Sequence, residues 1–321
     1  MPALISPVGL NHSDVTGTVN MTDPVAVADT ICAILGRRYP GFNEAFLRKG
    51  FSDIVDAFWG RYPGLLQCDT PYHDLRHSLG TALLMARLVD GYEETHAAGT
   101  PALGREEGTL AVILALYHDI GFLRRDSESD INGAFLVHDH EQRGVDFMRG
   151  YLARGAFADF ADQAELIHAT NFAKPLAEIL TGLPRQLYVI GQMIGTVDLV
   201  SQIASRYYLE RCYHYLYREF VTAGADRKID AEGRTVILYA TPEDLLRKTP
   251  GFYEHLAKKR IENDFENVAA HVAAHFGGVD PYAQGMQRNL AFLREMIARN
   301  DFTAMRRRPL PLMPLDGYEL P

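Results

Sequence analysis

The sequence predicts an all-α protein, and three features of the chain support that fold class. Apolar residues recur every three or four positions through most of the chain, as they do on the buried face of a helix. Proline and capping residues precede several of these segments, and only residues 235–240 form a convincing strand-like run. We expect one all-helical domain over residues 23–304, a loose N-terminal arm over residues 1–22 and a proline-rich extended tail over residues 305–321.

The expected helices follow one another with short turns between them. Residues 24–38 begin at a proline, and Tyr39, Pro40 and Gly41 end that helix. Residues 106–117 are apolar on nearly all sides from Leu110 onward, which predicts a central position in the fold for this helix. Residues 187–220 predict one long helix, kinked near Gly191 or Gly195. The other expected helices are residues 43–61, a segment starting near residue 71, residues 136–154, 160–171, a helix capped by residue 241, and residues 251–276 and 281–299.

Composition and charge narrow the class of function. The 321 residues are 47% hydrophobic and 23% charged, which is typical of a globular protein with a sizeable core. A formal net charge of −9 argues against binding a nucleic-acid polymer, but a bound metal can still attract a small phosphate substrate. The three cysteines are far apart, so neither a disulfide framework nor a thiolate zinc site is indicated. No membrane span or secretory signal is expected, and the cytoplasm is the expected location.

Histidine and aspartate residues interrupt several apolar helical segments, which is costly unless something binds them. His118 and Asp119 end the most apolar segment, and Asp198 lies inside another one. His73 and His77 are four residues apart, so they share a face of a helix. The remaining candidates come from two further helices and are His140 and His168. This set of nitrogen and oxygen ligands without sulfur suits Mn, Fe, Co, Mg or Zn.

Other polar residues have more ordinary interpretations. A single histidine on a helix is usually structural or solvated, and this applies to His96, His214, His255, His271 and His275. His138 and His140 point different ways on a helix, and we favour His140 as the ligand. Arg76 and Lys174 are candidate contacts for a substrate phosphate, although exposed surface charges are the commoner interpretation of such residues.

The order of these residues resembles the HD-domain superfamily of metal-dependent phosphohydrolases. The stretch from Tyr72 to His77 reads YHDLRH and is similar to the YHNxxH motif of cyclic-nucleotide phosphodiesterases, with Asp74 where asparagine is usual. The resemblance continues through the HD pair at His118 and Asp119 and ends near Ser201. It implies an HD-type helical bundle with additional C-terminal helices, whose metal core lies at about residues 70–205.

The resemblance also implies roles for individual residues. His77, His118, Asp119 and Asp198 match the four core ligands, with Asp119 bridging two divalent metal ions. His140 and His168 match the extra histidines of members that hold a second metal firmly, and His73 matches the histidine that protonates the leaving oxygen. Two features depart from mammalian-type phosphodiesterases: Phe122 stands where they have another histidine, and their purine-binding glutamine has no clear counterpart.

Three functions are compatible with this ligand set. The preferred function is hydrolysis of a phosphodiester or nucleotide by a metal-activated water. The alternative is an HD-type diiron oxygenase that acts on a small hydroxylated substrate, because such enzymes use the same order of ligands. A binding protein that keeps the metal for structure or nucleotide sensing is the third. The aromatic segment 207–220 is either core or the face of a homodimer, and we favour core.

Overall fold

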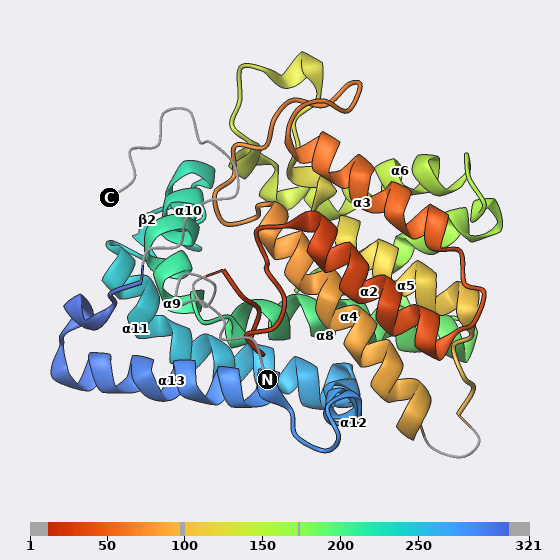
Figure 1. The fold of residues 1–321 in the computed structure, drawn as a ribbon. Coiled ribbons are helices and arrows are strands. Elements are labelled where there is room, and N and C mark those ends of the chain that lie inside the picture. The colour runs from red at the N-terminus through yellow and green to blue at the C-terminus, as the bar shows by residue number, and fades with distance from the viewer. Residues whose placement is uncertain (1–11, 97–99, 173, 308–321) are drawn as a thin grey trace.

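The computed structural model describes residues 12–96, 100–172 and 174–307. It confirms the all-α class, because helices make up nearly all of its regular structure (Figure 1). The longer helices of the first half are α2 (Pro24–Arg38), α3 (Glu44–Phe58), α4 (Leu75–Thr95), α5 (Arg105–Tyr117) and α6 (His140–Leu152). The second half contains α7 (Leu176–Ile179), α8 (Arg185–Ala204), α9 (Tyr208–Arg211), α10 (Tyr217–Ala223), α11 (Pro242–Phe252), α12 (Val272–His275) and α13 (Pro281–Arg299).

Helices α4, α5 and α8 pack against one another at the centre of the fold. The apolar residues of α5 are all fully buried, which confirms the central position that its sequence predicts. Helices α2 and α3 cover one side of this centre, and α12 and α13 lie along another side (Figure 1). Helix α8 is long and apolar enough to cross a membrane, but it is largely buried inside the protein as a core helix.

Side-chain caps fix where the main helices begin. Asp23 accepts hydrogen bonds from two backbone amides at the start of α2, and Asp280 does the same at the start of α13. Asp74 accepts from the amide of His77 at 3.1 Å and so caps α4. This cap matters for function, because it orients the first turn of α4, which carries two of the predicted site residues.

The prediction of one continuous helix over residues 187–220 is wrong. Helix α8 ends at Ala204, and the chain turns before α9, a π-helical segment (Cys212–Leu216) and α10. The two glycines expected to kink it instead permit close packing. A Cβ on Gly191 would lie 2.5 Å from Leu180 Cδ2, and one on Gly195 would lie 2.3 Å from Phe265 Cζ.

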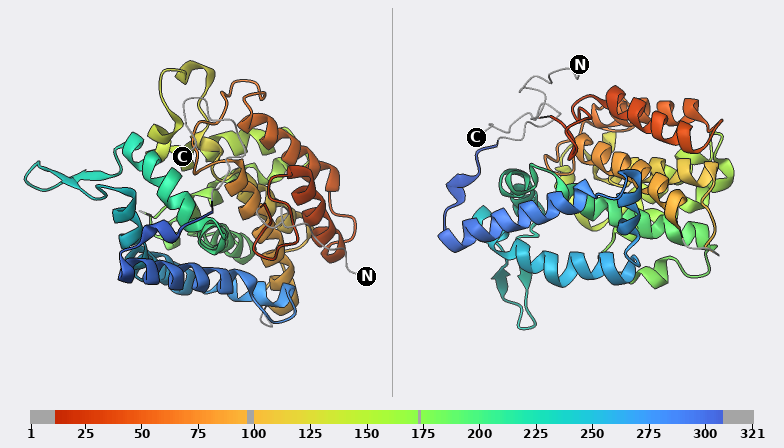
Figure 2. Two further views of the ribbon diagram at one scale, coloured as in Figure 1. Left: turned by 60° about the vertical axis from the view of Figure 1, so that its left-hand side comes forward. Right: turned by 60° about the horizontal axis from the view of Figure 1, so that its bottom comes forward.

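The strand-like segment is confirmed in part, as β2 (Thr235–Ile237). It pairs antiparallel with β1 (Arg227–Ile229), for which no strand was expected. The hairpin extends away from the helices (Figure 2). Its strands are exposed, so burial gave no apolar alternation from which β1 could have been recognised.

The N-terminal segment differs from the expected loose arm in its described part, which begins at residue 12. Val19 and Met21 are buried there, and the Asp14 carboxylate receives a hydrogen bond from Arg87 Nη1 at 2.7 Å. Arg87 also bonds the Tyr282 hydroxyl at 2.6 Å, so this turn is tied to both α4 and α13. Residues 1–11 and the tail from residue 308 onward lie outside the described residues.

Candidate metal centre and catalytic pocket

Four predicted ligands bring one nitrogen or oxygen atom each to a common point. His77 Nε2 lies 3.2 Å from His118 Nε2, 3.3 Å from Asp119 Oδ2 and 3.1 Å from Asp198 Oδ1. His118 Nε2 lies 3.3 Å from Asp119 Oδ2 and 3.5 Å from Asp198 Oδ1. Ligand atoms that sit roughly 2.1 Å from a metal ion are separated by about these distances.

Three central helices supply these ligands. His77 lies in the capped first turn of α4, His118 and Asp119 follow the last residue of α5, and Asp198 lies within α8. Because α4, α5 and α8 pack together at the core, their polar residues meet in its interior. The apolar surroundings that made these residues unusual in the sequence therefore form the walls of the site.

The protonation pattern of this cluster fits a cation. His118 Nδ1 donates a hydrogen bond to the Ala115 carbonyl at 2.8 Å, and its Nε2 faces His77 Nε2. Among the described residues, Asp119 Oδ2 is buried and has no hydrogen-bond donor. Two facing imidazole nitrogens and an unsatisfied carboxylate oxygen are costly unless a metal ion binds them. The residues present therefore fit a divalent metal.

The charges of the cluster reinforce one another. Burial disfavours the charged imidazole of His118, but the carboxylates of Asp119 and Asp198 outweigh burial and raise its pKa. Burial alone would raise the pKa of Asp119 and of Asp198, but the neighbouring imidazoles lower both. Both carboxylates therefore stay ionised at neutral pH, which is the form that binds metal.

The two extra histidines occupy different places. His140 Nδ1 donates to the Val137 carbonyl at 2.7 Å, and its Nε2 lies 3.9 Å from Asp119 Oδ1, on the side of Asp119 away from the cluster. His168 lies in the 3₁₀ helix η4 (Ala158–Thr170), with its Nε2 3.5 Å from Glu165 Oε2. His168 makes no ion-pair contact with Asp119 or Asp198. Its role as a ligand of a second metal stays a prediction.

His73 is held by a carboxylate that the sequence did not reveal. His73 Nδ1 lies 2.6 Å from Glu219 Oε2, and Glu219 Oε1 accepts the backbone amides of Tyr72 at 2.6 Å and His73 at 3.2 Å. Burial lowers the pKa of His73, but Glu219 outweighs it and the net effect is a raised pKa. Glu219 therefore favours the protonated form of His73, and Nε2 is the ring nitrogen that Glu219 does not engage.

Phe122 lies between the imidazoles of His73 and His140. Its ring stacks on His73 at a centroid distance of 4.3 Å and on His140 at 4.2 Å. The phosphodiesterase motif has a histidine at this position, so the departure noted in the sequence replaces a polar ring by an apolar one. The stacking fixes the planes of both imidazoles and excludes water between them.

A buried ion pair stabilises the segment from Tyr72 to His77. Arg211 Nη2 donates to Asp74 Oδ1 at 3.0 Å and also to the Tyr72 carbonyl. Asp74 and Arg211 are both buried. Asp74 in place of asparagine is therefore matched by a guanidinium from α9, and the pair connects the loop that carries His73 to the start of α4.

The metal centre opens into a cavity of about 430 Å³. His73, Asp119, His140 and Asp198 form its polar end, and its other walls are mainly apolar and aromatic. The wall residues include Phe172, Leu216, Phe220, Tyr239, Leu245 and Phe252. Gln202 is also at the polar end, where it donates to Asp198 Oδ1 at 3.1 Å and accepts from the Tyr72 hydroxyl at 2.5 Å.

The two candidate phosphate contacts do not line this cavity. Arg76 points into a separate pocket beside Tyr207, and burial lowers the pKa of its guanidinium. Lys174 is exposed, and its backbone amide donates to Asn171 Oδ1 at 3.0 Å. The role of both residues in substrate binding stays a prediction that these positions do not support.

Comparison with known proteins identifies the class of the chain. Residues 74–207 match the model of the HD domain. The chain therefore contains an HD domain, and the superfamily that its motifs predicted is confirmed. No curated protein matches it.

Among solved structures, the fold is similar to the phosphodiesterase domain of the RhoPDE fusion protein from the choanoflagellate Salpingoeca rosetta. The TM-score is 0.56 at 15% sequence identity, and the alignment covers 92% of this chain and 97% of that one. At this identity the likeness concerns the fold. It extends beyond the HD domain to the C-terminal helices, which the sequence motifs did not reach.

Proposed function

We propose that the protein is a metal-dependent phosphohydrolase that cleaves a phosphodiester or nucleotide through a metal-activated water, with His73 as general acid. The observation that carries this proposal is the adjacency of two groups in one cavity. The cluster of His77, His118, Asp119 and Asp198 can hold a metal, and its two aspartates line the cavity. The His73 imidazole, whose protonated form Glu219 favours, lines the same cavity. Neither group alone would define the reaction class.

Each residue has a separate task in this reaction. A divalent metal held by the cluster would polarise the phosphoryl oxygens and lower the pKa of a bound water toward neutrality. Asp198 is held in place by Gln202, which in turn is fixed by the Tyr72 hydroxyl. His73 keeps its proton at Nε2 while Glu219 binds Nδ1, and it transfers that proton to the leaving oxygen as the phosphorus–oxygen bond breaks.

The shape of the cavity supports a substrate with an organic group attached to the phosphate. Its aromatic and aliphatic walls can bury a base or another planar group, while the phosphate reaches the polar end. The one glutamine that lines the cavity, Gln202, is already engaged by Asp198 and Tyr72. We therefore propose the phosphodiester and nucleotide class without a preference for cyclic nucleotides.

The proposal is tested with the full chain and a panel of esters. Purified protein is supplied in turn with Mn, Mg, Fe, Co and Zn and assayed on bis-p-nitrophenyl phosphate, on nucleoside monophosphates and on linear and cyclic nucleotide diesters. We expect turnover of at least one ester, abolished by chelation and by His118→Ala. Absence of hydrolysis with every metal, together with absence of nucleotide binding, would refute the proposed function.

A further inference from the structure

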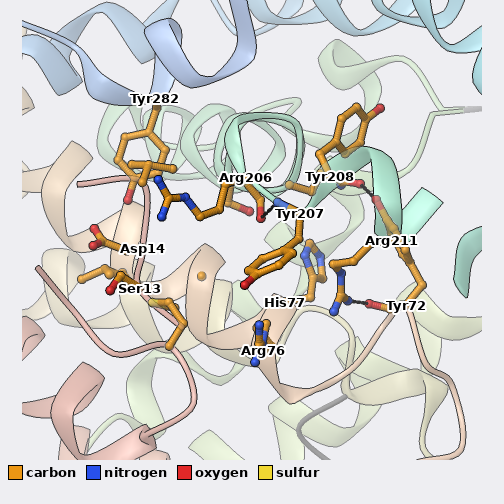
Figure 3. A pocket seen from close by; sticks show the side chains of 17 residues that line it. Ser13, Asp14, Tyr72, Arg76, His77, Arg206, Tyr207, Tyr208, Arg211 and Tyr282 are labelled. Atoms are coloured by element: carbon orange, nitrogen blue, oxygen red, sulfur yellow. Dashed lines mark hydrogen bonds between the residues drawn. The ribbon is translucent and has the colours of Figure 1, made fainter. Parts of the chain in front are cut away.

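A second pocket, of about 80 Å³, lies on the opposite side of the first turn of α4. It shares Tyr72, Gln202 and Tyr208 with the catalytic cavity, so a thin wall of side chains separates the two. The N-terminal turn, α4, the turn between α8 and α9, and Tyr282 of α13 surround it (Figure 3). The proposed hydrolysis uses His77, Tyr72 and Gln202 from this lining, but it gives no role to Arg76 or to the space that the pocket encloses.

Arg76 is the unexplained group in this pocket. Its Nε and Nη2 atoms are buried and have no hydrogen-bond acceptor among the described residues. Its guanidinium carbon lies 5.9 Å from the centroid of the Tyr207 ring. This cation–π contact stabilises the positive charge, but the ring accepts none of the in-plane hydrogen bonds of the guanidinium. Buried donors without an acceptor are costly, so these two nitrogens require water or an anion as their acceptor.

The nearby carboxylates do not supply that acceptor. Asp74 is bound by Arg211 at 3.0 Å, and Asp14 is bound by Arg87 at 2.7 Å. Asp14 also accepts hydrogen bonds from Thr16 and from backbone amides of its own turn. Both anions thus have partners, and the Arg76 donors stay unmatched.

The other lining groups favour an anion of small size. Arg206 and Arg211 also line the pocket, together with Ser13, Ser201 and Ser205. A water molecule needs about 10–15 Å³ of such space, so the pocket holds several waters or one tetrahedral oxyanion. A nucleotide-sized ligand needs a cavity of roughly 300 Å³ or more and does not fit.

We propose that this pocket binds a small oxyanion of the phosphate class, held by the planar donors of Arg76. Arginine suits such a ligand, because its fork of donors matches two oxygens of a phosphate or sulfate at once. The occupant is either the free ion or the phosphate group of a larger molecule. The site does not depend on the proposed hydrolase function. It shares His77 with the metal centre, so an ion bound there adjoins the backbone that positions a metal ligand.

The test measures anion binding to the full chain, as purified, by isothermal titration calorimetry. The probes are inorganic sulfate, inorganic phosphate and glycerol 3-phosphate. Sulfate has the same shape and charge class as phosphate but is not a product of phosphoester hydrolysis. The variants are Arg76→Met and Arg76→Gln, with Arg61→Met as the matched control, because Arg61 is an exposed arginine far from the pocket lining. Thermal melting confirms that each variant folds.

We expect sulfate and phosphate to bind at least tenfold more weakly to both Arg76 variants and unchanged to Arg61→Met. Tighter binding of glycerol 3-phosphate than of phosphate would identify the phosphate group of a larger molecule as the occupant, and weaker binding would identify the free ion. Without ligand, Arg76→Met should melt no lower than the natural protein, because the buried charge it removes has no acceptor. Equal affinity of the Arg76 variants and the natural protein would overturn the proposal, since any anion bound would then sit at the metal centre.

Discussion

The pairing of His73 with Glu219 makes the sharpest prediction about mechanism. Glu219→Gln keeps the size of the side chain but removes the charge that lies 2.6 Å from His73 Nδ1. A general acid contributes about 10²–10⁴ to a rate, and a hundredfold loss corresponds to about 2.7 kcal/mol of transition-state stabilisation. We expect kcat to fall about a hundredfold in Glu219→Gln and by about 10²–10⁴ in His73→Ala, for substrates with an alkoxide leaving group.

The choice of substrate separates this role from a structural one. The p-nitrophenolate ion leaves readily without a proton, so both variants should lose less than about tenfold on bis-p-nitrophenyl phosphate. Glu219 acts only through His73 in this account, so the double variant should be no slower than His73→Ala alone. Equal losses on both kinds of ester, or losses that multiply in the double variant, would refute the assignment.

The pH dependence of the rate tests the role of His73 independently. The general acid works only while it is protonated, so the rate falls as the pH rises through the pKa of His73. Burial lowers this pKa, whereas the Glu219 carboxylate raises it by a larger amount. Removing the carboxylate leaves burial as the main influence, so the basic limb of kcat/KM should move to lower pH in Glu219→Gln. A limb that stays in place would mean that another group donates the proton.

Three further changes test the rest of the site. Asp119→Ala should release bound metal, measured by elemental mass spectrometry, because this carboxylate contacts three of the predicted histidine ligands; full occupancy would exclude its bridging role. Arg211→Met should lower the free energy of unfolding in urea by about 3–5 kcal/mol, because Asp74 would stay buried without its guanidinium partner; a loss below about 1 kcal/mol would contradict this. Gly121→Ala should destabilise the protein strongly in thermal melts, because the added Cβ would lie 1.8 Å from a backbone carbonyl oxygen of α6. The control Gly150→Ala has open space for its Cβ and should be neutral or stabilise the helix by about 0.5–1 kcal/mol. Equal melting temperatures of the two variants would contradict the packing argument.

The sequence was sufficient to predict four residues that the fold brings together at the candidate metal centre. His77, His118, Asp119 and Asp198 are each a polar residue inside or at the edge of an apolar helix, and burial makes such residues conspicuous. Apolar helices of this kind lie at the centre of an all-α fold, so the polar residues that they carry are expected to meet there. The predictions for the start of α2 and for α13 succeeded because an aspartate cap precedes a proline in both.

The supporting groups could not be predicted, because they come from distant parts of the chain. Glu219 is 146 residues from His73, in an aromatic stretch where it resembled an exposed charge on a helix. Its only signal was a carboxylate in a segment that proved to be core. Tyr208 and Tyr215 of that stretch are buried, as the core interpretation predicts, whereas Tyr213 and Tyr217 are half-buried.

For Arg76, the sequence led to a wrong expectation, because its role was inferred from its neighbour His77. It is adjacent to His77, but successive residues on a helix point about 100° apart. Arg76 therefore faces the pocket on the other side of α4, where its guanidinium meets Tyr207 and not the metal centre. Gly191 and Gly195 were similarly interpreted as a kink, although they allow Leu180 and Phe265 to approach the helix.

The most direct measurement is the metal content of the purified chain by elemental mass spectrometry, with phosphodiester turnover measured on the same sample. The account predicts about two equivalents of a divalent metal and turnover that disappears and returns with the metal. Bound iron without hydrolysis, accompanied by oxygen uptake on a small hydroxylated substrate, would contradict it and identify the HD-type oxygenase instead.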